Sequence, residues 1–220
     1  MKKSLRPFVL ILSALLGGAS VAPAAAQQPQ ASTIVQKMIE RNPDLHSFAA
    51  RVHIDVRMLS FPFYSPKLEG TSYFKRPDNY QVVLDRTPPF ARTIDRFFSD
   101  LADPSTWERR FDIVPEGLSV VGGRHVIQMK LVAKIRGMID HTLVSVDPAN
   151  YDVVQLEWHY YNGGLITMQQ TYQSVAGYRV LASQHAEIHI PHVRAVADSQ
   201  YSDYHTNVVV SDSVFMETHK

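Results

Sequence analysis

The sequence contains no cysteine, no long apolar run and no excess of one charge sign, and each absence excludes a class of protein. Without cysteine, no disulfide bond can brace the fold, and no residue near a cleavage site can carry a lipid anchor. No stretch approaches the about 20 apolar residues that a membrane-spanning helix requires. We therefore expect a mature chain that is soluble and does not span a membrane.

The charges nearly cancel, with 22 Lys and Arg against 21 Asp and Glu. Three of the basic residues, Lys2, Lys3 and Arg6, lie at the start of the chain, and the remainder keeps 19 against 21. Proteins that bind nucleic acids usually present a concentrated positive surface to the phosphates. The composition therefore predicts no nucleic-acid partner.

The first 26 residues have the three parts of a secretory signal peptide. A basic start is followed by the short apolar stretch 8–16 and then by Ala24-Ala25-Ala26, which fits a cleavage site. The apolar stretch is too short to cross a bilayer, which disfavours an uncleaved anchor. We expect cleavage after Ala26, export to the periplasm, and a single domain over residues 27–220.

Most of the remaining chain follows the two-residue period of β-strands. The pattern is clearest at 48–59, where apolar and polar residues alternate. Further strands are predicted at 68–75, 80–85, 125–135, 140–146, 153–161, 165–172, 179–190 and 194–205. Short turns between successive strands favour an antiparallel meander. Eight or nine strands with few helices predict a mainly β protein (α+β) whose curved sheet forms an incomplete barrel.

Two segments show helical spacing instead. An early apolar stripe consists of Ile34, Val35, Met38 and Ile39. Ser32 can cap this helix, and Asn42-Pro43 can end it. A second stripe, in the insert 88–107, consists of Ile94, Phe97, Phe98 and Leu101. Residues 106–110 can add a helical turn, and the insert is either an ordinary core helix or a mobile cover over a cavity.

The strand patterns also predict which side chains face inward. The apolar face of the first strand presents Phe48, Val52, Ile54, Val56 and Met58. Continued alternation places Phe74, Arg76, Tyr80, Val82 and Leu84 on the inward side, and gives Leu156, Trp158 and Tyr160 a common face. A curved sheet lined in this way either closes on a filled core or holds a cavity. Both alternatives agree with the sequence.

One cluster of histidines suggests a metal-dependent hydrolase as a second hypothesis. His185, Glu187 and His189 alternate on one strand face, and His192 follows shortly afterwards. Imidazole and carboxylate groups can bind zinc. The same pattern is typical of the wet face of an antiparallel strand, which we favour. No H-E-x-x-H, P-loop, nucleophile elbow or dinucleotide-binding turn occurs, so we expect no enzyme, metal or other cofactor.

Two stretches of the chain are similar to a known family. "NPDLHSF" leads into the first strand, and "EGTSYFKRPDNYQVVLD" has Gly70 at the head of a strand, Lys-Arg-Pro at 75–77 and Tyr80 in the next strand. The late strands and a tail with Asn207 and Phe215 continue the similarity. In these features the mature chain resembles the LolA-like family of periplasmic carriers of outer-membrane lipoproteins. It departs from the family in the insert, which is helical in pattern where the family has strands.

The resemblance implies an incomplete barrel that holds the acyl chains of a lipid or lipoprotein in an apolar cavity. The inward residues given above would line that cavity, and the helix around 94–101 would form its lid. Arg76 would latch the lid by donating hydrogen bonds to backbone carbonyls. Inner- and outer-membrane sorting proteins would be its partners. A related envelope-stress sensor binds lipid or lipoprotein without carrying it, and this remains an alternative.

Overall fold

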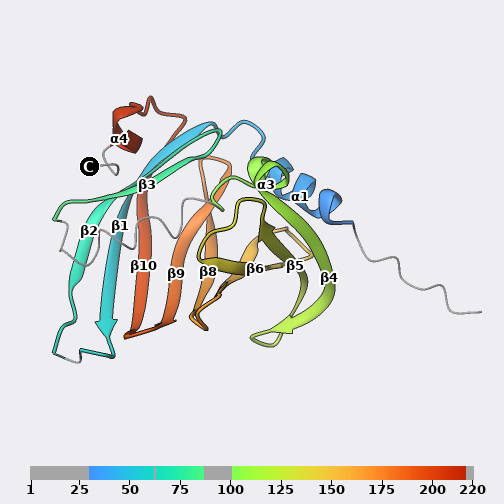
Figure 1. The fold of residues 1–220 in the computed structure, drawn as a ribbon. Helices are drawn as coiled ribbons and strands as arrows, with labels where there is room; N and C mark the ends of the chain where they lie inside the picture. The colour runs from blue at the N-terminus through green and yellow to red at the C-terminus, as the bar shows by residue number, and fades with distance from the viewer. Residues whose placement is uncertain (1–29, 62, 87–100, 217–220) are drawn as a thin grey trace, which may run out of the picture.

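The computed structural model describes residues 30–61, 63–86 and 101–216. Within these residues the main feature is one ten-stranded antiparallel sheet of order β3-β2-β1-β10-β9-β8-β7-β6-β5-β4, curled into an incomplete barrel (Figure 1). This confirms the predicted fold class. The predicted signal peptide and the lid residues Ile94, Phe97 and Phe98 lie outside the described residues.

The three longest strands, β10, β9 and β1, lie next to one another in the sheet. The bounds are β1 (Ser47–Met58), β2 (Lys67–Lys75), β3 (Asn79–Leu84), β4 (Phe111–Val121), β5 (Arg124–Ala133), β6 (Ile139–Val146), β7 (Val153–Tyr160), β8 (Leu165–Val175), β9 (Tyr178–Ile190) and β10 (Val193–Thr206). Neighbours in sequence pair as a meander from β1 to β3 and from β4 to β10, and β10 returns to pair with β1, which leaves β3 and β4 at the two edges. That pairing joins the two halves of the chain.

Strand β4 was not expected, so the sequence estimate of eight or nine strands is wrong. The apolar alternation of β4 is interrupted by Pro115 and Gly117, between which the pairing with β5 shifts register. A proline is tolerated here because β4 is an edge strand, where one side of the backbone has no partner to lose. The local sequence pattern alone therefore does not predict a strand at this position.

The early helix forms as predicted and covers the concave side of the sheet. Helix α1 (Ala31–Glu40) buries Ile34, Val35 and Met38 in the same core cluster as side chains of β5 to β9. Its start differs from the prediction, because Gln30 occupies the N-cap position and Ser32 lies in the first turn. No side chain caps the helix, so its stability derives mainly from the buried stripe.

The described end of the insert completes the cover. Leu101 is buried, and a 3-10 turn η2 (Pro104–Thr106) leads into α3 (Trp107–Arg110), which lies beside α1 (Figure 1). Trp107 packs into the core cluster with α1. The predicted helical turn at 106–110 is thus present. A short helix α4 (Ser213–Met216) ends the described chain, and none of the helices in the described ranges is long and apolar enough to cross a membrane.

Candidate functional site

A cavity of about 160 Å³ lies between the concave face of the sheet and its cover. The sheet contributes residues of β1 to β3 and of β7 to β9, and the cover contributes the end of α1, the chain just after it and residues of the segment 101–107. The apolar part of its wall consists of Met38, Ile39, Leu45, Phe48, Phe74, Leu101, Ala102, Pro104, Trp107, Val153, Leu156, Trp158, Met168, Val180 and Leu181. The structure therefore holds a partly open core, one of the two alternatives that the sequence allowed.

The predicted lining residues divide into two groups. Those on the cavity wall are Phe48, Phe74, Tyr80, Leu156 and Trp158, together with Arg76 and Leu101. The others, Val52, Ile54, Val56, Met58, Val82 and Leu84, lie outside this cavity, and their role in ligand binding stays a prediction. Strand alternation identifies the face on which a side chain lies, but it does not say how far along the strand the cavity extends. Val52, for example, is fully buried in the packed sheet.

Arg76, directly after β2, contacts the chain that follows α1. Its Nη1 donates to the carbonyl of Pro43 at 3.2 Å, and its Nη2 donates to the carbonyl of Asn42 at 3.1 Å. Its Nε lies 3.8 Å from Oδ2 of Asp103. The side chain thus bridges the sheet and both parts of the cover, which is the geometry that a latch requires. Its action as a latch remains a prediction.

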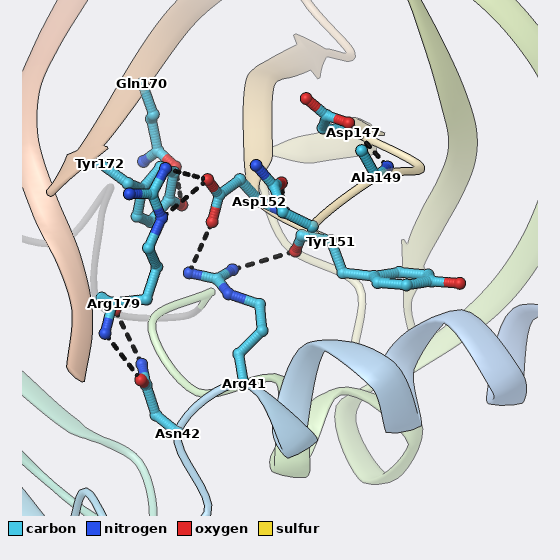
Figure 2. A network of polar contacts seen from close by, with 10 residues as sticks. Arg41, Asn42, Asp147, Ala149, Tyr151, Asp152, Gln170, Tyr172 and Arg179 are labelled. Atoms are coloured by element: carbon cyan, nitrogen blue, oxygen red, sulfur yellow. Dashed lines mark hydrogen bonds and ion pairs between the residues drawn. The ribbon is translucent and has the colours of Figure 1, made fainter. Parts of the chain in front are cut away.

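A second polar contact, which the sequence did not indicate, fixes the end of α1 from the other side (Figure 2). Asp152 lies between two guanidinium groups. Nη2 of Arg41 is 2.9 Å from Oδ1 of Asp152, and Nη2 of Arg179 donates to Oδ2 at 2.7 Å. Nη1 of Arg41 also donates to the carbonyl of Tyr151 at 2.9 Å. Because Asp152 is almost fully buried, both ion pairs are shielded from water.

Asn42 adds a backbone connection to the same network (Figure 2). Its side-chain amide donates to the carbonyl of Arg179 at 2.7 Å, and its Oδ1 accepts from the Arg179 N–H at 2.8 Å. The hydrogen bond from Arg179 to Asp152 raises the pKa of that guanidinium. Arg41 and Asn42 are more than a hundred positions from Asp152 and Arg179, so no local sequence pattern could have found the network.

The cavity wall also carries neutral polar groups. The Tyr172 hydroxyl donates to Oε1 of Gln170 at 2.9 Å, and the Tyr201 hydroxyl donates to Oε1 of Gln184 at 2.7 Å. Burial raises the pKa of Tyr172 to about 12, and it also raises the pKa of Tyr80. Tyr172 and Tyr80 therefore stay neutral at physiological pH and serve as hydrogen-bonding groups of the cavity wall.

The histidine cluster lies apart from the cavity. Nδ1 of His185 is 2.6 Å from Oδ1 of Asp198, and its Nε2 is 3.8 Å from Glu187 on an exposed part of β9. His189 is paired across the sheet with Arg194 and Leu165. Among the described residues, no three His, Cys, Asp or Glu side chains are placed to hold a metal ion. The geometry thus gives the hydrolase hypothesis no support.

The structure is similar to three solved structures over nearly their whole length. A DUF1329 family protein from Desulfovibrio piger matches with a TM-score of 0.63 and 10% identity, covering 84% of this chain and 96% of that chain. A putative outer membrane lipoprotein-sorting protein domain from Vibrio parahaemolyticus gives 0.62 and 11%, covering 84% and 95%. A LolA superfamily protein from Nitrosomonas europaea gives 0.60 and 13%, covering 85% and 97%.

These likenesses establish that the fold is LolA-like. No protein-family model matches the sequence, and no curated protein matches it significantly. At 10–13% identity the three structures share the fold of this chain, and a shared fold alone does not identify a ligand. The function must therefore be argued from the cavity and its wall.

Proposed function

We propose that this protein is a non-enzymatic periplasmic binding or carrier protein for the acyl chains of lipids or lipoproteins. The observation that carries the proposal is the cavity between a curved apolar sheet face and a cover held by a few polar contacts. A filled core would need no space at this position, and an enzyme would need a constellation of reactive groups. The lipoprotein-sorting and LolA superfamily proteins among the similar structures support the same class of ligand.

The size of the cavity indicates how such a ligand would enter. An apolar cavity of about 150 Å³ holds a molecule the size of benzene, whereas an acyl chain is several times larger. A complete chain therefore requires part of the cover to move. Each methylene removed from water contributes about 0.8 kcal/mol, so a long chain gains on the order of 12 kcal/mol before costs. That gain can replace the apolar contacts that Leu101 and Trp107 make in the empty protein.

Release requires the opposite step. When the cover returns to the sheet, Arg76 regains its hydrogen bonds to the carbonyls of Asn42 and Pro43. Because Arg76 stays partly exposed to solvent, the two hydrogen bonds together contribute about 1–2 kcal/mol, which favours the empty form. Arg76 would thus act as a latch that helps to expel cargo toward a membrane-bound sorting partner. A sensor with this fold would bind cargo without that transfer.

Uptake of an apolar fluorescent dye, N-phenylnaphthylamine, tests the proposal. We expect the folded protein to bind the dye and an acyl lipid to displace it. Leu181→Trp should weaken uptake about tenfold or more, because the larger side chain fills the cavity at a partly exposed position of its wall. Val83→Trp, on the exposed side of β3 and outside the cavity, is the matched control. A folded wild type that takes up no dye would refute the binding function.

A further inference from the structure

Four residues of the cavity wall each have one buried polar atom without a hydrogen bond: Nε of Arg41, Nε of Arg76, Oδ2 of Asp103 and Nε1 of Trp107. Arg41 belongs to the network around Asp152, whereas Arg76 approaches Asp103, four residues before Trp107. Asp103 is 3% exposed and Trp107 is 1% exposed, so bulk water does not solvate either side chain. A buried polar group without a partner is costly, and native proteins leave few of them. The atoms of Arg76, Asp103 and Trp107, all residues of the cavity wall, therefore point to a ligand.

The other polar atoms of Arg76 and Asp103 already have hydrogen-bond partners. Only the unpaired atoms of Arg76, Asp103 and Trp107 therefore remain available to a ligand. Both terminal nitrogens of Arg76 donate to backbone carbonyls. The other carboxylate oxygen of Asp103 accepts from the Ser105 N–H at 3.0 Å, which fixes the carboxylate at the start of η2. Nε of Arg76 and Oδ2 of Asp103 remain 3.8 Å apart, too far for a direct hydrogen bond. The available set is thus two N–H donors and one carboxylate acceptor.

We infer that these atoms form a polar subsite for the head of an acyl cargo, an inference that rests on the proposed function. The head is an uncharged group that both accepts and donates hydrogen bonds, such as an amide or a hydroxyl-bearing ester. A carbonyl oxygen accepts from Nε of Arg76 and Nε1 of Trp107, and an N–H or O–H donates to Asp103. The subsite therefore selects among lipids by their heads, while the apolar wall binds their chains.

The charges around the subsite exclude an anionic head. Arg76 and Asp103 balance one another, so a neutral head leaves no buried charge without a partner. A free carboxylate or a phosphate would place a second negative charge beside Asp103 in a poorly solvated site. The guanidinium groups of Arg41 and Arg179 do not offset that charge, because both already pair with Asp152.

Displacement of N-phenylnaphthylamine from the delipidated protein by lipids of one chain length tests this inference. The competitors are dodecanamide, monododecanoylglycerol and dodecanoate, each at neutral pH and below its aggregation concentration. We expect the amide and the glyceride to displace the dye with a Kd about tenfold or more below that of the acid. Equal affinities for the three lipids, or tightest binding of the acid, would overturn the inference.

Two substitutions test which atoms of the subsite bind the head group. Trp107→Phe removes the Nε1 donor but keeps an aromatic ring, and should weaken dodecanamide relative to the dye by about 2- to 12-fold. Asp103→Asn removes the negative charge and should reduce the disadvantage of dodecanoate by a similar factor. The control is Asp112→Asn, an exposed carboxylate outside the cavity, which should change neither ratio.

The outcomes separate this inference from the function on which it rests. If the folded protein binds neither the dye nor any lipid, the proposed function fails and the subsite fails with it. If the dye and the lipids bind but the head group makes no difference, the subsite alone is refuted. The same holds if both folded variants keep the head-group preference of the wild type.

Discussion

The end of α1 and the segment 101–107 cover the same cavity, but different forces hold them. The end of α1 is fixed from two sides, by Arg76 on its carbonyls and by Asp152 on its Arg41 side chain. The segment 101–107 packs through Leu101 and Trp107, and its charged contact with the described sheet residues is the 3.8 Å approach of Asp103 to Arg76. On the proposed function, we therefore expect α1 to stay in place and the segment 101–107 to move when an acyl chain enters.

The largest expected effect on stability comes from a substitution that breaks the ion pairs at the end of α1. Asp152→Asn leaves the guanidinium groups of Arg41 and Arg179 without their shared charge partner in a buried position. We expect the free energy of unfolding to fall by about 3 kcal/mol. Urea denaturation followed by circular dichroism measures this. Asp212→Asn, which breaks an exposed ion pair with Lys75, should cost less than about 1 kcal/mol.

Asp103→Asn sharpens the comparison, because it makes the same chemical change at another buried carboxylate of the cover. Asp103 has one guanidinium partner, that of the partly exposed Arg76 at 3.8 Å, whereas Asp152 has two closer ones, and an asparagine Oδ1 can still accept from Ser105. We expect the free energy of unfolding to fall by about 1 kcal/mol, less than for Asp152→Asn. If Asp103→Asn destabilises the protein as much as Asp152→Asn, the two parts of the cover are held equally and the comparison is wrong.

Arg76→Leu tests the contact that links both parts. The variant loses two hydrogen bonds to the carbonyls of Asn42 and Pro43 but keeps apolar bulk. We expect the free energy of unfolding to fall by about 1–2 kcal/mol, while dye binds more tightly and leaves more slowly. Stopped-flow release and equilibrium titration check both expectations. Arg57→Leu, an exposed arginine of β1, is the control.

Should dye affinity and release be the same for Arg76→Leu and the wild type, with both folded, Arg76 is not a latch. Its hydrogen bonds would then stabilise the fold without any link to cargo. A change in stability alone cannot decide this, because the loss of any buried hydrogen bond lowers stability. The release rate is therefore the decisive readout for Arg76.

Local patterns predicted much of the fold because its elements are regular. The alternation at 48–59 gave β1, and the stripe at Ile34, Val35 and Met38 gave the buried face of α1. Strand β4 was not predicted, because Pro115 and the register shift that follows it interrupt the two-residue alternation. The pairing of β1 with β10 joins residues such as Phe48 and Thr206. These residues are far apart in the sequence, and turn patterns predict only the pairing of strands that follow one another.

The site could be predicted only where it follows from alternation or from family resemblance. Alternation placed Phe48, Phe74 and Trp158 on the correct face, and the resemblance singled out Arg76. The partners of Arg41 and Asp103 depend on how distant segments pack. Polar groups that meet across the fold have no spacing to recognise.

Native mass spectrometry of the protein purified from the periplasm tests the central claim most directly, namely that the cavity under the cover holds acyl chains. The account predicts a wild-type species that carries the added mass of an acyl lipid. Leu181→Trp should lack that mass, and Val83→Trp should retain it. A wild-type protein with no added mass, which also fails to take up an acyl lipid after mixing, would contradict the account.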